Sequence, residues 1–141
     1  MIEIIATAES VEQAKQLLEA GVDTLYIGEE MFGLRLPVSF SREEQQEITA
    51  LAHAAGKRVS IGVNGIMHPD KMKKIPEYLQ FLVALQPDQL VIGDPGVIYT
   101  MQQENIKIPF IYDGETMVTS SRQINFWAKK GASGAVLARE I

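Results

Sequence analysis

Five polar or ionisable residues stand at, or just after, the ends of short apolar runs: Glu29, Asn64, His68, Asp94 and Asp113. A carboxyl group or an imidazole beside a substrate can take up and release a proton during a reaction, and an imidazole does so near neutral pH. Parallel strands collect such residues at one edge of a sheet, where α/β proteins bind their ligands. We therefore predict Glu29, His68 and Asp94 as the catalytic residues of one site.

Other residues of the same pattern suit substrate binding. The guanidinium of Arg35 can hold a carboxylate or a phosphate through two parallel hydrogen bonds, and an ion pair with a nearby glutamate is the structural alternative. For Arg139 the alternative is an ion pair with Glu140 or another neighbour. The predicted substrate-binding residues are Arg35, Asn64, Asp113, Glu115 and Arg139.

Each catalytic candidate also has a structural interpretation. Glu29 and Glu30 are adjacent in an extended segment, so their side chains point apart, and a solvated loop would explain both. His68 has no second histidine at the spacing of a zinc motif, and packing of its loop would explain it as well. Asp94 precedes Pro95-Gly96 and suits a turn or a helix entry. We predict no metal site within these residues.

Composition excludes several classes of protein. The 141 residues are 46% hydrophobic and 22% charged, which is the balance of an ordered domain and not of a disordered chain. No apolar run reaches the roughly 18 residues of a membrane span. The net charge of −5 argues against a free-standing nucleic-acid binder, which normally has a basic face. Without cysteine, these residues supply no disulfide, thiolate nucleophile or thiolate ligand of an iron–sulfur cluster, and we expect a cytoplasmic protein.

Short apolar runs alternate with helical periodicity along the chain. Strands are predicted at residues 2–7, 24–28, 59–64, 89–93, 109–113 and 134–140. Helices are predicted from Ser10 and Ser41, which open capping boxes, from about residue 70, from 95 to 101 and from 120 to 130. The helical spacing of Met72, Phe126 and Trp127 places them in the core and not in an aromatic binding site.

Alternating strands and helices predict a parallel sheet with right-handed crossovers, and the apolar runs suggest that both of its faces are covered. A closed eight-stranded barrel takes about 250 residues. Six strands and five helices therefore predict an incomplete, TIM-like (β/α) barrel, with residues 1–141 as the N-terminal portion of a larger domain. A six-stranded, flavodoxin-like open sheet is the alternative. Uncovered edges at the first and sixth strands predict self-association.

Several short motifs occur in order along the chain. Residues 28–35 fit a Gly-x-x-x-Phe-Gly-x-Arg loop, and residues 63–68 fit Val-Asn-x-x-x-His. The others are the helix entry Ala6-Thr7-Ala8-Glu9-Ser10, Asp94-Pro95-Gly96-Val97, Phe126-Trp127 and Leu137-Ala138-Arg139-Glu140. On these motifs the chain resembles the collagenase-like peptidase family, family U32, from residue 2 to residue 140. One motif departs from the family, because many members carry Ser-Thr-Gln where this chain has Asp113-Gly114-Glu115.

The resemblance implies a (β/α) barrel-type domain of a bacterial cytoplasmic protein about twice this length. Members of the family are described as proteases that act on collagen-like substrates. Others take part in oxygen-independent hydroxylation of transfer RNA, ribosomal RNA or quinone precursors, with an iron–sulfur cluster held by cysteines of the family's second half. A cofactor, whether a metal or that cluster, would then be bound outside these 141 residues.

The first functional prediction is a peptidase with a rim site and a peptide or protein substrate, in which an acidic group or His68 activates water. The chain contains no Gly-x-Ser-x-Gly turn and no His-Glu-x-x-His motif, so a serine hydrolase of that type and the common metalloprotease are not supported. The alternatives are a component of an iron–sulfur-dependent system that hydroxylates RNA or a small molecule, and a non-catalytic binding scaffold.

Overall fold

Strands and helices alternate through the computed structural model, which describes residues 2–34, 36–113 and 118–137. The strands are β1 (Ile5–Thr7), β2 (Thr24–Ile27), β3 (Arg58–Val63), β4 (Gln89–Ile92), β5 (Phe110–Tyr112) and β6 (Ala132–Ala135). The helices are α1 (Val11–Ala20), α2 (Arg42–Ala54), α3 (Pro69–Met72), α4 (Ile75–Leu85), α5 (Pro95–Gln103) and α6 (Ser121–Lys129).

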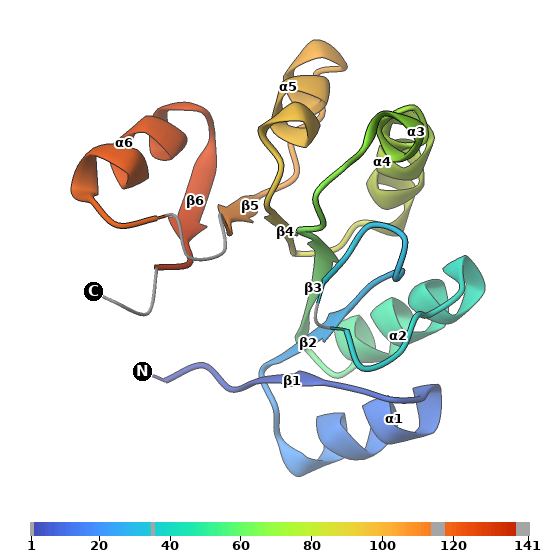
Figure 1. Cartoon of the computed structure of the whole chain (residues 1–141). Helices are drawn as coiled ribbons and strands as arrows, with labels where there is room; N and C mark the ends of the chain where they lie inside the picture. Colours follow the sequence, from blue (N-terminus) through green and yellow to red (C-terminus); the bar gives the residue numbers. More distant parts are fainter. Residues whose placement is uncertain (1, 35, 114–117, 138–141) are drawn as a thin grey trace.

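The six strands form one parallel sheet in the order β1-β2-β3-β4-β5-β6. A flavodoxin-like sheet reverses its strand order to place helices on both faces, so that alternative is wrong. Figure 1 shows the strands along an arc with the helices outside it, and with β1 and β6 at the two edges. The predicted incomplete (β/α) barrel is confirmed.

The two faces of the sheet differ in polarity. Leu25, Ile61 and Leu90 share the helix-covered face and are fully buried. The opposite, inner face carries Tyr26 and Gln89, which are partly exposed. Thr24 and Ser60 on this face are buried, so the inner face is polar and only partly open. The helices lie on the other face because every crossover in a sequentially ordered sheet passes over the same face.

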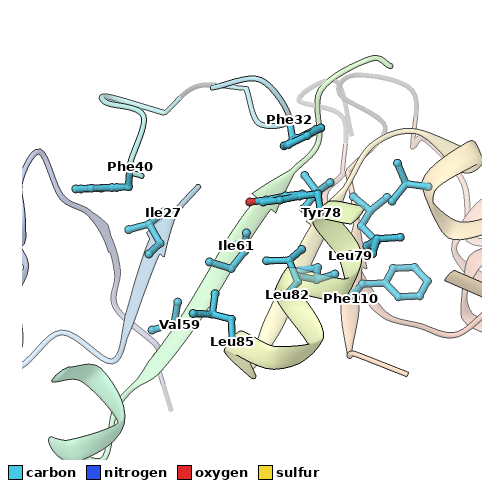
Figure 2. Packing of buried hydrophobic residues seen from close by; sticks show 14 of the residues in the cluster. Ile27, Phe32, Phe40, Val59, Ile61, Tyr78, Leu79, Leu82, Leu85 and Phe110 are labelled. Carbon is cyan, nitrogen blue, oxygen red and sulfur yellow. The ribbon is translucent and has the colours of Figure 1, made fainter. Parts of the chain in front are cut away.

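The core lies between the sheet and the helices outside it, and α4 contributes Tyr78, Leu79, Leu82 and Leu85 to it. Leu82 and Leu85 of α4 lie toward Ile61 and Val59 of β3, whereas Leu79 lies toward Phe110 (Figure 2). At the upper end of this layer, the Tyr78 ring stacks on Phe32 of the β2–α2 loop, with 4.2 Å between the ring centroids. The core thus extends from the sheet to a loop that borders the carboxyl ends of the strands.

Local capping begins two helices where the sequence predicts them. Ser41 Oγ accepts the Glu44 N–H at 3.1 Å, and Glu44 Oε1 accepts the Ser41 N–H at 3.0 Å. At α1, Ser10 Oγ accepts the Gln13 N–H, whereas the Gln13 side chain returns to the N–H of Glu9. The capping box at Ser41 is confirmed. At Ser10 only half of the box forms, because the Gln13 side chain accepts from the N–H of Glu9 and not from that of Ser10.

The single helix expected from about residue 70 is two helices, so the described residues contain six helices and not five. Pro76 is the second residue of α4. A proline there has no N–H to bond the carbonyl of Met72, and its ring clashes with that carbonyl. The chain therefore ends α3 at Met72 and begins α4 at Ile75.

The terminal strands differ from their predicted bounds. β1 is limited to Ile5–Thr7, because only these residues lie opposite β2, while the N–H of Ile4 donates to the Asp23 carboxylate. β6 is Ala132–Ala135 and not 134–140, because pairing with β5 begins directly after the turn at Gly131, whose φ is 106°. The predicted end of that strand at Arg139 lies outside the described residues.

Helix α6 contacts the sheet through fewer residues than its pattern predicts. Trp127 is partly buried and stacks on Tyr112, with 4.1 Å between centroids. Met72 of α3, which was also predicted in the core, is partly buried as well. Phe126, predicted in the core, is 51% exposed because it lies one residue further around the helix and packs edge-on against Trp127.

Across the structurally described residues, no helix is long and apolar enough to cross a bilayer.

The exposed edges of β1 and β6 lead to the first testable expectation. Ile5 is 54% exposed on β1, and a lysine on an edge strand blocks strand addition. The chain should self-associate at tens of micromolar in sedimentation velocity, and Ile5→Lys should shift it toward monomer. Val83→Lys adds the same charge at an exposed position of α4 and should leave association unchanged. A strictly monomeric wild-type chain would contradict the expectation.

Candidate functional site

Asn64 joins three neighbouring segments at the carboxyl ends of the strands. Its side chain is 5% exposed and directly follows β3. Asn64 Oδ1 accepts the N–H of Leu34 at 2.8 Å, and Asn64 Nδ2 donates to Asp113 Oδ2 at 3.2 Å. A buried amide is costly unless it is hydrogen-bonded. Asn64 therefore holds the β2–α2 loop and the end of β5 against β3.

Gly93 lies between the backbones of these same strand ends. A Cβ at position 93 would lie 2.7 Å from the carbonyl oxygen of Asn64 and 2.8 Å from that of Asp113. Such contacts are too short for a side chain, and the atoms they meet are backbone. The close approach of β3, β4 and β5 at this edge thus depends on glycine.

Asp94 fixes the loop that follows β3. Its Oδ1 accepts the N–H of Gly96 at 2.8 Å, as expected of a helix N-cap, and its Oδ2 accepts the N–H of Met67 at 3.0 Å. Both carboxylate oxygens are therefore occupied by backbone donors. The predicted catalytic role of Asp94 remains a prediction, whereas the positioning of the 64–68 loop is what the geometry shows.

Tyr112 ends β5 beside the two aspartates. Burial raises the pKa of the Tyr112 phenol, and the negative charges of Asp94 and Asp113 raise it further. Its ring is held against Trp127. This edge of the sheet therefore carries negative charge and hydrogen-bond acceptors, which suit a ligand that presents N–H or hydroxyl donors.

Sequence reasoning missed Tyr26 on the inner face. Its hydroxyl lies 3.5 Å from Asn64 Oδ1, and a Cβ at position 62 would lie 2.5 Å from that hydroxyl. The signal was present, because Leu25 and Ile27 are the apolar neighbours that face the helices. Strand periodicity then places Tyr26 on the opposite face.

Glu29, predicted as catalytic, lies in a separate group of side chains on the helix side. We call Glu29, Arg42, Gln45 and Tyr78 the Glu29 network. Glu29 Oε1 accepts from Arg42 Nε at 3.3 Å and from Gln45 Nε2 at 3.1 Å. Gln45 Oε1 in turn accepts from the Tyr78 hydroxyl at 3.3 Å, and Gln45 and Tyr78 are fully buried. The network therefore ties the β2–α2 loop to α2 and α4.

Two further features place Arg42 and Tyr78 in this network. The Arg42 guanidinium lies 5.1 Å from the centroid of Phe81 and also pairs with Glu77 at 3.2 Å. Burial, and then the charge of Glu29, raise the pKa of Tyr78 far above its usual value, so its phenol is a neutral donor. Gln45 shares the helical stripe of Ile48 and Ala52, and this position could have identified it as buried.

The remaining predicted residues are placed as follows. His68 is exposed before α3, and its ring makes no hydrogen bond or ion pair with any residue in the described part of the chain. Arg35, Glu115 and Arg139 lie outside the described residues. The structure thus brings together Asn64, Asp94 and Asp113, and it does not bring Glu29 to them.

A cavity of about 490 Å³ lies elsewhere among the described residues. It opens between α5, the segment before β5 and the start of β6, and it is lined by Ile98, Met101, Ile106, Ile108, Phe110 and Lys130 among others. That is the amino end of the strands. We place the candidate site at the opposite edge, because the polar side chains converge there and parallel α/β folds bind ligands at the carboxyl ends.

The residues of this chain do not fit an iron–sulfur cluster, because the sequence has no cysteine to supply thiolate ligands. Among the described residues, no group of three or more His, Asp or Glu side chains is arranged to hold a metal ion.

The Glu29 network leads to an expectation about stability. Tyr78→Phe removes the hydroxyl and leaves Gln45 Oε1 buried without that donor, which should lower the free energy of unfolding by about 1–3 kcal/mol. Urea unfolding followed by circular dichroism measures the change. Tyr99→Phe, at a position 62% exposed on α5, is the matched control and should stay within about 0.5 kcal/mol. Equal stability of the two variants would contradict the network.

The Tyr112 environment leads to an expectation about pH. Because its pKa is raised in the fold, Tyr112 favours folding at low and neutral pH. That contribution should be lost as the pH rises from about 10, where unfolded tyrosines ionise, through the higher folded value. Asp113→Asn should lower the pKa of Tyr112, read as phenolate absorbance after subtraction of a Tyr112→Phe titration. Glu47→Gln, which removes an equal charge on α2, should not lower it, and an unchanged pKa in Asp113→Asn would refute the assignment.

Comparison with known proteins gives one family and several relatives. The sequence model of peptidase family U32 matches residues 9–141. The chain is 36% identical over 139 residues to the tRNA hydroxylation protein P2 of Bacillus subtilis, covering 99% of this chain and 45% of that protein. It is 26% identical over 140 residues to the tRNA hydroxylation protein P of Escherichia coli, covering 99% of this chain and 31% of that protein. The chain thus spans less than half the length of these curated relatives.

Solved structures show the same fold at low identity. The U32 peptidase Mk0906 superposes with a TM-score of 0.77 at 17% identity, covering 97% of this chain and 58% of that chain. Phosphoribosyl anthranilate isomerase from Thermotoga maritima superposes with a TM-score of 0.63 at 13% identity, covering 97% of this chain and 61% of that one. These neighbours agree with an incomplete, TIM-like barrel.

Proposed function

The chain belongs to peptidase family U32, and from that membership we propose that it is part of a protein that hydroxylates RNA, in which it supplies one portion of a barrel and a substrate-binding edge. The observation that carries the proposal is the pair of relatives named for tRNA hydroxylation, which match nearly the whole chain. The sequence favoured a peptidase first and RNA hydroxylation second. The relatives favour the second prediction, and a cytoplasmic location is part of this proposal.

The site chemistry supports a nucleic-acid substrate. Asp113, held by Asn64, presents a carboxylate at the edge of the sheet, and Tyr112 adds a neutral phenol beside it. Ribose hydroxyls and the N–H groups of bases donate to such acceptors, and RNA-binding sites commonly read these groups. We propose that Asn64 and Asp113 contact the substrate, with Arg35, Glu115 and Arg139 as further contacts.

Other residues are proposed to orient the site. Asp94 holds the 64–68 loop through Met67, and Glu29 holds the β2–α2 loop through Arg42 and Gln45. Both would act on catalysis through position. His68 is proposed as a proton-transfer or contact group, because it is the exposed last residue of the 64–68 loop.

The peptidase prediction is kept as the second proposal, on the name of the family and of the structural neighbour Mk0906. Hydrolysis by a nucleophile needs a base within hydrogen-bond reach of it. Within the described ranges, His68 has no such partner, and Ser120 bonds the backbone N–H of Gln123. These contacts give no support to a Ser–His nucleophile pair, and the preference for RNA modification rests on the relatives named for tRNA hydroxylation.

A chimaera tests the proposal. The matching segment of the Bacillus subtilis tRNA hydroxylation protein P2 is replaced by this chain in a strain without hydroxylating activity of its own. Mass spectrometry of tRNA nucleosides should then detect products with one added oxygen atom. Asp113→Asn should reduce them about ten- to hundredfold, the loss expected from one charge-assisted hydrogen bond.

A control variant of the chimaera is measured in the same strain. Glu47→Gln removes one exposed carboxylate from α2 and should leave the modification at the level of the unsubstituted chimaera. A folded chimaera that yields no oxygenated nucleoside but cleaves gelatin would overturn the proposal in favour of a peptidase.

A further inference from the structure

We infer that the turn between β3 and α4 is a contact surface for the phosphate backbone of RNA. Its cationic side chains are Lys71, Lys73 and Lys74, with His68 at its start, and we call residues 68–74 the lysine turn. The inference rests on the proposed function for the choice of RNA as the polyanion. The location of the surface is argued from the charge of these lysines, from their lack of ion pairs within the described residues and from the packing of the turn.

Positive charge is concentrated in this turn, although the chain as a whole is acidic. The whole chain has a net charge of −5, yet three lysines stand within four residues here, and Asp70 is the one acid of the turn. Lys73 and Lys74 are exposed, and Lys71 is partly exposed. A local basic surface on an acidic protein is an electrostatic footprint for a phosphate-bearing partner.

The lysines are not used inside the protein. In the part of the chain that the structure describes, none of the three forms an ion pair or a side-chain hydrogen bond. Arg42 pairs with Glu29 and Glu77, and Arg58 with Glu3, but the ion pairs of the described residues include no lysine at all; what sets the lysine turn apart is that three lysines stand within four residues. Lys71 and Lys74 stand three residues apart, a spacing at which like charges repel by about 0.2–0.5 kcal/mol, while Asp70 stands at the attractive spacing from Lys73 and Lys74.

The turn is held rigidly from both ends. Met67 before it is 8% exposed, and Ile75 after it is fully buried. The N–H of Lys74 donates to the carbonyl of Lys71 at 2.9 Å, and the N–H of Met72 donates to that of His68 at 2.9 Å. A preorganised surface loses less entropy on binding than a mobile one.

The turn also adjoins the candidate site. The N–H of Met67, next to His68, bonds Asp94 Oδ2 at 3.0 Å. On the other side of the turn, Met72 packs on the first turn of α5, since a Cβ at position 96 would lie 2.8 Å from Met72 Cε. A strand of RNA with its backbone on the lysine turn could therefore present a nucleotide to the edge that holds Asn64 and Asp113. RNA is chosen over an acidic peptide from the proposed function, and competition by poly-glutamate tests that choice.

The test measures binding of a fluorescent single-stranded oligouridylate to the 141-residue chain by anisotropy over a series of salt concentrations. The variant Lys71→Gln/Lys73→Gln/Lys74→Gln should weaken binding at low salt by at least tenfold. The slope of the logarithm of affinity against the logarithm of salt concentration should become shallower by about 2, because each phosphate contact on a single strand contributes about 0.7. The corresponding triple Lys→Arg variant keeps the charge and should restore binding.

The control removes the same charge elsewhere. Lys15, Lys107 and Lys129 are exposed and lie away from the lysine turn. Lys15→Gln/Lys107→Gln/Lys129→Gln changes the net charge equally and should weaken binding by no more than about twofold, because these lysines make no contact with RNA that lies on the lysine turn. Equal loss in both triple variants, wild-type affinity of the lysine-turn variant, absence of RNA binding by the wild-type chain, or equal displacement of the RNA by poly-glutamate would each overturn the inference.

The outcome separates this inference from the proposed function. If the chimaera hydroxylates tRNA while the Lys→Gln substitutions change neither RNA binding nor modification, the lysine turn is refuted and the proposed function stands. If the lysine turn binds RNA but the chimaera yields no modified nucleoside, the surface stands and the proposed function fails.

Discussion

The side-chain amide of Asn64 is the interaction on which the carboxyl edge of the sheet depends. It is nearly inaccessible to water, so both ends of the amide need partners within the protein. The partners are the N–H of Leu34 and the carboxylate of Asp113, which belong to segments that follow β2 and β5. Satisfying one amide therefore holds together parts of the chain that are about 30 and 49 residues away from it in sequence.

Charged residues near this edge divide into two sets by the face of the sheet they occupy. Glu29 lies toward the helices with Arg42 and Gln45, where it stabilises a loop. Asp113 lies at the strand end with Asn64. The division follows from the sequential strand order, because that order places all helices on one side and leaves the inner face for polar groups.

Average composition hides the electrostatic character of the molecule. A net charge of −5 argues against nucleic-acid binding if the charge is spread evenly. In the described part of the chain the basic side chains are not spread evenly, because Lys71, Lys73 and Lys74 stand within four residues of one turn and are partly or fully exposed. A polyanion responds to such a surface and not to the total charge, since screening limits the reach of each charge to about 10 Å.

Local sequence suffices for the features that a short segment decides alone. The capping box of Ser41 and Glu44, the alternation of elements and the positions of β2 and β4 follow from patterns within a few residues. Tertiary structure decided the rest. The register of β6 against β5, the burial of Gln45 and the direction of Glu29 toward Arg42 each depend on a partner from another segment. Periodicity assigns a residue to a face, but only packing selects which distant group meets it there.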